Sequence, residues 1–174
     1  ELNEFREVLE KVLITLDPNI KKVTISNDSN RAFVVKYDDG KIVIVQDKQV
    51  ISDLPYFSSG TKYGFRIADV LYGIKKHRNG IYYVDELFSY INSDIEVASL
   101  STMIQLLGDD EQLFFTTHNA EIMNLNLPLH SFSFLGKQNI DGKPTIMFIS
   151  ANEFEKRNNV VVKNLYNNDI FGIA

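Results

Sequence analysis

Two short apolar runs, each followed by polar residues, constrain the fold of this chain most. Ile81–Val84 is a continuous apolar run that leads into Asp85-Glu86, and Leu113–Phe115 leads into Thr116-Thr117-His118. Such runs are typical of strands buried on both faces, as in a parallel sheet. The stretch between them, about Ile95 to Leu107, has the pattern of a helix. Strand, helix and strand in this order predict an α/β fold.

The remaining segments add helices and hairpins to this centre. Apolar residues at three- and four-residue spacing predict a helix from Leu2 to Leu16, which Asp17-Pro18 ends. Thr61 to about Lys76 has the same character. Asp39-Gly40 and Asp141-Gly142 are turn signals between strand-like runs. The predicted strands are Val23–Ser26, Ala32–Tyr37, Lys41–Gln46, Ser131–Leu135 and Thr145–Ile149, and Asn119–Met123 is predicted as a short helix.

Composition excludes several classes of protein. The chain of 174 residues has 18 Lys+Arg and 23 Asp+Glu, so 18 − 23 gives a net charge of −5, which argues against a fold built around nucleic-acid phosphates. The absence of Cys excludes disulfides, thiolate metal sites and a Cys nucleophile. No apolar run reaches the roughly 20 residues that span a bilayer, and no leader opens the chain. We expect a soluble, cytoplasmic protein without a membrane partner. Because residue 1 is not Met, the chain could be a piece of a longer one.

The acidic pair at the end of the first run could handle phosphate. Loops at the carboxyl ends of parallel strands form binding crevices, and Asp85, Glu86 and His118 all fall at such ends. One carboxylate can hold Mg²⁺ through its water shell, and a second can polarise an attacking water. The alternative is that Asp85-Glu86 is a strand end with two solvated acids.

Two further features fit the same chemistry. A neutral His118 could donate a hydrogen bond to a γ-phosphate oxygen, or it could simply cap the start of a helix. The segment Phe57-Ser58-Ser59-Gly60-Thr61 precedes a predicted helix. Small residues and unpaired N–H groups at a helix start can bind an anion, although an N-cap followed by a turn glycine would look the same.

The order and spacing of these features resemble the carboxyl-terminal half of an ABC-type ATPase. Phe57–Thr61 looks like the signature motif, Ile81–Glu86 like a Walker B strand with its catalytic Glu, and His118 like the switch histidine. Ser89–Asp94 lies where the D-loop would be. The Ser-Ser-Gly-Thr and Thr-Thr-His-Asn variants resemble those of the stand-alone prokaryotic ATPases of the recombination, repair and OLD-related group.

This resemblance implies a P-loop NTPase lobe, with a largely parallel sheet flanked by helices and a small antiparallel hairpin region near the start. Residues 1–174 would form one partial ATPase domain, with the helix and hairpin region in 1–50 and the motifs in 51–174. The implied cofactors are ATP and Mg²⁺. The resemblance implies catalytic roles for Glu86 and His118, contacts to Mg²⁺ through water for Asp85, and ATP binding by Ser58, Ser59, Gly60, Thr61 and Asn92.

The sequence also departs from the family. It contains no Gly-x-x-x-x-Gly-Lys-Ser/Thr phosphate loop, which in the family would lie upstream of Glu1. We therefore expect ATP binding and hydrolysis only in the completed protein, a head-to-tail homodimer that could also engage DNA or an effector protein. One alternative is a non-catalytic module that pairs with an ATPase subunit. Another is a hydrolase whose metal Asp85, Glu86 and His118 ligate directly, at about 2.0–2.2 Å.

Overall fold

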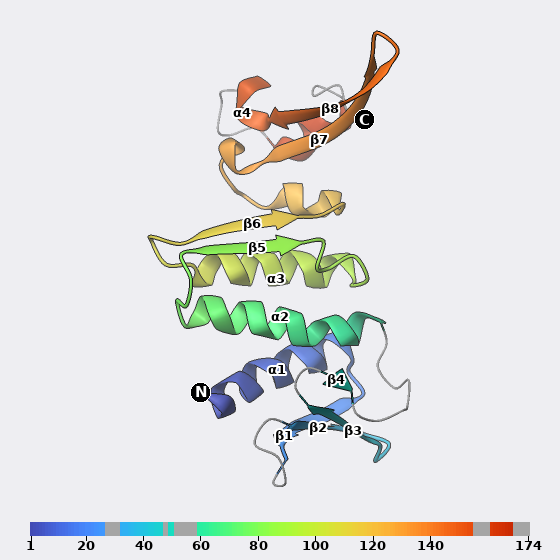
Figure 1. The fold of residues 1–174 in the computed structure, drawn as a ribbon, viewed down its shortest axis with the longest axis vertical. Coiled ribbons are helices and arrows are strands. Elements are labelled where there is room, and N and C mark those ends of the chain that lie inside the picture. Colours follow the sequence, from blue (N-terminus) through green and yellow to red (C-terminus); the bar gives the residue numbers. More distant parts are fainter. Residues whose placement is uncertain (27–31, 47–48, 51–58, 155–160, 169–174) are drawn as a thin grey trace. The chain divides into compact units, whose positions relative to one another are not determined.

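A computed structural model describes residues 1–26, 32–46, 49–50, 59–154 and 161–168 of the chain (Figure 1). They divide into two compact units, Glu1–His118 and Asn119–Ala174, and each is described by itself. No helix among the described residues is long and apolar enough to cross a membrane.

The first unit contains helices α1 to α3 and strands β1 to β6. Their bounds are α1 Leu2–Leu16, β1 Ile20–Ile25, β2 Ala32–Tyr37, β3 Ile42–Gln46, β4 Gln49–Val50, α2 Ser59–Lys75, β5 Ile81–Asp85, α3 Ser93–Leu106 and β6 Gln112–Thr116. Strands β1 to β4 form an antiparallel sheet in sequence order, and β5 pairs with β6 in parallel. The predicted helices and the hairpin around Asp39-Gly40 are confirmed, and β1 begins at Ile20 rather than Val23.

Helix α1 forms because its apolar residues fall on one face, and it buries that face between the antiparallel sheet and α2. Leu9 and Leu13 are fully buried, together with inward-facing residues of β1 to β3 such as Val23 and Val35. A Cβ atom at Gly64 of α2 would lie 2.6 Å from Cδ2 of Leu13. The two helices therefore pack closely because this position carries no side chain.

A second core joins α2 and α3 to the inner face of the β5–β6 pair. Its most deeply buried residues are Ile67, Ile74, Val84, Phe88 and Met103. Within this unit, α2 and α3 lie on one side of the parallel pair (Figure 1). This core holds β5 and β6 in a fixed register, so it also fixes the positions of the residues that follow them.

Two expectations about the sheets are wrong. Of the strand pairs described, only β5–β6 is parallel, so the predicted largely parallel sheet is not observed. Tight turns at Asp39-Gly40 and Asp141-Gly142 reverse the chain and produce antiparallel pairs instead. The apolar strands are also not buried on both faces. Ile81, Tyr83 and Phe114 are exposed, because the described helices of this unit cover only the opposite face.

The second unit is built on a long hairpin. Its elements are η1 Ala120–Asn124, η2 Leu129–Ser131, β7 Ser133–Ile140, β8 Lys143–Ser150, α4 Ala151–Phe154 and α5 Val162–Asn167. One face of the antiparallel β7–β8 pair packs on a core that includes Met123, Leu129, Phe132 and Val162. The predicted turn at Asp141-Gly142 and the short helix near Asn119–Met123 are confirmed, the helix as a 3₁₀ segment.

Candidate functional site

The parallel pairing of β5 and β6 brings the two polar strand ends to one edge. Asp85 is the register partner of Thr116, and the preceding residues pair in step from Ile81 and Gln112 onward. Both strands point the same way in Figure 1. Glu86 follows β5, and His118 lies two residues beyond β6. Asp85, Glu86 and His118 therefore lie at the same edge of neighbouring strands, as the strand pattern predicts.

Thr116 connects the two strand ends. Its hydroxyl Oγ1 donates to Oδ1 of Asp85 at 2.5 Å and accepts from the backbone N–H of Glu86 at 3.1 Å. The same N–H also donates to the carbonyl of Thr116, at 3.2 Å. One hydroxyl thus orients the Asp85 carboxylate and holds the backbone of Glu86. Sequence pattern alone assigns Thr116 no role, because its two partners depend on the register between β5 and β6.

Glu86 begins a tight turn that directs its carboxylate to His118. Its φ angle of +45° lies in the left-handed region, which a non-glycine residue rarely adopts. Ser89 stabilises this turn, because its N–H and its hydroxyl both donate to the carbonyl of Glu86. Oε1 of Glu86 lies 2.9 Å from Nε2 of His118, with the side chains 52% and 86% exposed. The contact is open to solvent, so both side chains could also reach a ligand at this edge.

A buried carboxylate supports the segment that carries His118. Glu96, in the first turn of α3, is only 4% exposed, and its Oε1 accepts a 2.5 Å hydrogen bond from the hydroxyl of Thr117. A buried acid that meets such a partner stabilises one conformation of the backbone around it. Neither Glu96 nor Thr117 was a predicted site residue. The acidic residues of a first helical turn usually face solvent, so no sequence pattern indicates this contact.

The other predicted residues stand in different positions. Asn92 is the N-cap of α3, where its side chain accepts from the N–H of Asp94 at 2.8 Å, and Thr61 is fully buried in the first turns of α2. Ser59 and Gly60 are described only as the first residues of α2, and Ser58 lies outside the described residues. The predicted contacts of these five residues with ATP therefore stay predictions.

The side chains at this edge fit a cation that keeps its water ligands better than a cation bound directly by three side chains. Among the residues that the structure describes, no group of three or more His, Asp and Glu side chains could hold a metal ion. Asp85, Glu86 and His118 are therefore not arranged as a three-ligand group in this structure. Asp85 is exposed and has one oxygen engaged by Thr116. A single carboxylate of this kind suits Mg²⁺ that keeps most of its water ligands.

The opposite end of the parallel pair is organised by Glu111. Its side chain is 8% exposed and accepts from the N–H of Gly108 at 2.7 Å and from the hydroxyl of Tyr82 at 3.0 Å, and it lies 2.9 Å from Nδ1 of His77. The hydrogen bond from Gly108 contributes most to holding the pKa of Glu111 below its usual value, followed by the one with His77. Burial raises the pKa of Tyr82, whose hydroxyl also donates to the carbonyl of Gly73.

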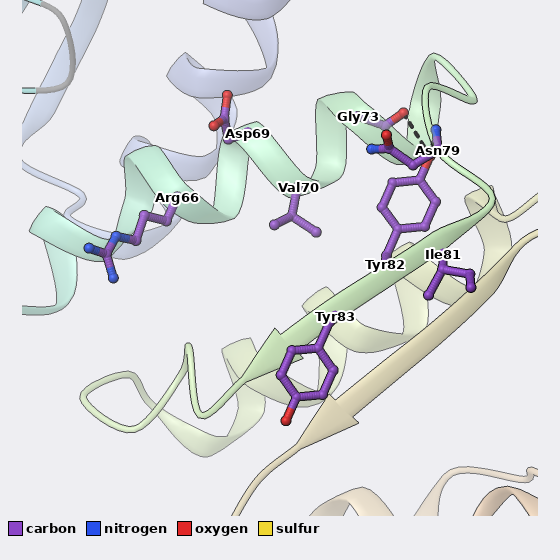
Figure 2. Close-up of a pocket in the computed structure, with 8 residues that line it drawn as sticks. All are labelled: Arg66, Asp69, Val70, Gly73, Asn79, Ile81, Tyr82 and Tyr83. Atoms are coloured by element: carbon purple, nitrogen blue, oxygen red, sulfur yellow. Dashed lines mark hydrogen bonds between the residues drawn. The ribbon is translucent and has the colours of Figure 1, made fainter.

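A shallow pocket of about 400 Å³ lies between α2 and β5, beside this network (Figure 2). It is lined by Arg66, Asp69, Val70, Gly73, Asn79, Ile81, Tyr82 and Tyr83. None of the predicted site residues lines it. The pocket is therefore separate from the edge formed by Asp85, Glu86 and His118.

Comparisons with known proteins give similarity in structure but not in sequence. No protein-family model and no curated protein matches the chain. An SMC ATPase, from work on ATP-driven dimerization and DNA-stimulated activation, shares 13% identity over 98% of this chain and 92% of its own, with a TM-score of 0.52. The Smc head domain with an extended coiled coil bound to the C-terminal domain of ScpA, from Pyrococcus furiosus, shares 14% identity over 88% of this chain, with a TM-score of 0.52.

The chain spans 36% of the length of that second structure. Identities this low establish a likeness of fold and nothing finer. SMC heads belong to the ABC-type ATPases, so the likeness agrees with the resemblance that the motifs carry. The chain thus has an α/β fold similar to that of SMC ATPase head domains.

Proposed function

We propose that this chain contributes the signature, Walker B and switch-histidine part of a composite ATP-hydrolysing site. The main support is the convergence of Asp85, Glu86 and His118 at one edge of two parallel strands, with Glu86 and His118 in contact at 2.9 Å. The likeness to SMC ATPase heads supports the same class of activity. The narrower assignment to the recombination, repair and OLD-related group rests on the motif variants alone.

Each residue has a defined task in this proposal. Mg²⁺ would supply charge neutralisation of the phosphates, and Asp85 would hold it through water, in the orientation that Thr116 sets. Glu86 accepts a proton from the attacking water, and His118 donates a hydrogen bond to a γ-phosphate oxygen. Ser58, Ser59 and Gly60 would contact the γ-phosphate in the opposite subunit of a dimer, and Asn92 would contribute from the D-loop position.

We further propose that the chain is inactive alone. Phosphoryl transfer depends on positioning and on electrostatic stabilisation, and the phosphate loop with its Lys supplies most of both. No such loop occurs in the 174 residues. In isothermal titration calorimetry, the isolated chain should show no micromolar binding of ATP. Micromolar binding would contradict the composite-site proposal.

The decisive experiment joins the chain to a segment that carries a phosphate loop, which the upstream coding sequence of its gene should reveal. ATP hydrolysis by the completed protein should fall by about 10²-fold or more in Glu86→Gln, because the proton acceptor is lost. Glu7→Gln removes the same charge from an exposed position on α1 and should hydrolyse ATP at the wild-type rate. Equal rates for Glu86→Gln and wild type would remove Glu86 from the mechanism.

The missing loop favours a second candidate, a non-catalytic module that pairs with a separate ATPase subunit. It predicts that the coding sequence upstream of Glu1 encodes no Gly-Lys-Ser/Thr loop. The first candidate predicts that the loop is present. The SMC ATPase with similar structure comes from work on ATP-driven dimerization and DNA-stimulated activation. For the completed protein we therefore propose an ATP-dependent homodimer, with DNA or an effector protein as a further partner.

A further inference from the structure

The outer face of the antiparallel sheet combines two lysines with a group of aliphatic residues. Two rows of register partners cross it. Lys22 of β1 faces Lys36 of β2, which faces Ile42 of β3, and Thr24, Val34 and Ile44 form the next row. These six residues are called the outer face. The opposite face of the same sheet packs on α1, so the outer face is the side of β1 to β3 turned away from that core.

The lysine pair is unfavourable for the sheet. Like charges directly opposite each other on neighbouring strands destabilise the pairing. Both lysines are exposed, and neither forms an ion pair among the described residues. Two acidic groups on neighbouring segments are engaged elsewhere. Asp39, in the β2–β3 turn, pairs with Lys41 at 2.6 Å, and Glu10 of α1 accepts from the N–H of Val23.

The aliphatic part of the outer face is also largely open to solvent. Ile42 and Ile44 are 52% and 42% exposed, and they stand two residues apart on the same side of β3. Val34 lies directly opposite Ile44 and is half-buried. The three side chains form one continuous aliphatic strip, and Lys36 borders it. A ligand that covers this face must therefore offer apolar surface and negative charge within one strand spacing.

We propose that the outer face binds an acidic, amphipathic segment of a partner protein. Carboxylates of that segment lie between Lys22 and Lys36 and relieve their repulsion, and its apolar side chains cover Val34, Ile42 and Ile44. Nucleic acid would satisfy the lysines, but its phosphate backbone leaves the isoleucines exposed. This proposal does not depend on the ATPase assignment.

The test uses defined probes and fluorescence anisotropy at low ionic strength. A labelled amphipathic peptide with Glu on its polar face and Leu on its apolar face should bind. The same peptide with Lys in place of Glu should bind at least about tenfold more weakly, which is about 1.4 kcal/mol. The double variant Lys22→Glu, Lys36→Glu should reduce affinity for the acidic peptide by at least the same factor.

Matched controls distinguish an effect at the outer face from a general effect of net charge and from a loss of stability. Lys11→Glu with Lys75→Glu makes the same charge change on α1 and α2 and should leave binding unchanged. Lys36→Glu alone places opposite charges across the strands, so it should raise the unfolding temperature while it weakens peptide binding. A purely structural role for Lys36 would lower the unfolding temperature instead.

Several results would overturn the proposal. Equal binding of the acidic and basic peptides, or equal loss in the control double variant, would show that the outer face does not select acidic segments. Binding of a duplex DNA probe without binding of the acidic peptide would assign the lysines to nucleic acid. Self-association in sedimentation that the Lys22→Glu, Lys36→Glu variant abolishes would make a second copy the occupant.

Discussion

The two ends of the β5–β6 pair differ in how firmly their acidic residues are held. At the amino end, Glu111 is nearly buried and three donor groups from separate segments converge on it. At the carboxyl end, Glu86 and His118 contact each other directly, and both side chains are exposed to solvent. The same two strands thus have one end built for stability and one end left open to ligands. The comparison shows that the burial of an acidic residue and the number of its hydrogen-bond partners distinguish a stabilising role from an exposed position that a ligand can reach.

The largest expected effect is on stability at the amino end. Tyr82→Phe removes a hydroxyl whose single proton is shared between the carbonyl of Gly73 and the carboxylate of Glu111, and leaves these two acceptors without it. We expect a loss of roughly 1–3 kcal/mol in the free energy of unfolding, measured by urea denaturation followed by circular dichroism. Tyr83→Phe, at the exposed neighbouring position, is the matched control and should unfold like wild type.

The second prediction concerns acid. Because hydrogen bonds from Gly108 and His77 lower the pKa of Glu111 in the folded state, the stabilisation by its carboxylate is complete above the usual value of 4.5. It is lost as the pH falls through the lowered folded pKa. Stability should therefore decline below about pH 4.5. In Glu111→Gln this decline should be smaller, whereas Glu7→Gln on α1 should retain it. An unchanged acid response in Glu111→Gln would contradict this role.

A smaller effect is expected at the junction of the two strand ends. Thr116→Val keeps the shape of the side chain but removes the hydroxyl that connects Asp85 with the N–H of Glu86. We expect a loss of about 0.5–1.5 kcal/mol in the free energy of unfolding. Thr116→Ser restores the hydroxyl and should recover most of this loss. Equal stability of the Val and Ser variants would show that the hydrogen bonds contribute little.

The smallest effect on stability belongs to the open end. Glu86→Gln and His118→Ala should each change the free energy of unfolding by less than about 0.5 kcal/mol, because the pair is exposed and its charges are screened. In the completed ATPase the same two variants should lose hydrolysis. A large loss of stability in either variant would erase the contrast between the two ends.

The local parts of this fold could be predicted from sequence. The spacing from Leu2 to Leu16 gave α1, and the turn signals Asp39-Gly40 and Asp141-Gly142 gave two hairpins, because each depends on neighbouring residues. The strand ends at Asp85 and His118 could be predicted because an apolar run that stops at polar residues is itself a local pattern. If the two strands are parallel neighbours, their carboxyl ends lie at one edge, so the pattern also predicts that Asp85 and His118 lie close together.

The contacts between distant segments could not be predicted in this way. Thr116, Glu96 and Glu111 gain their partners only when separate elements pack together, and a sequence pattern carries no such register. The exposure of Tyr83 and Phe114 was also missed, because an apolar run looks the same whether one or both faces are covered. Burial is a property of the assembled layers, so it has to be read from the structure.

The contact between α1 and β1 has a consequence for how this protein avoids aggregation. The N–H of Val23 donates to Glu10 at 2.7 Å, and the carbonyl of Val23 accepts from Arg6 at 3.3 Å. Two side chains of one helix thus take the place of the strand that β1 would otherwise recruit. An unprotected strand border can template the growth of fibrils. Helix α1 therefore occupies the backbone groups of Val23 at the outer edge of the sheet, which removes one pairing position that another strand could use.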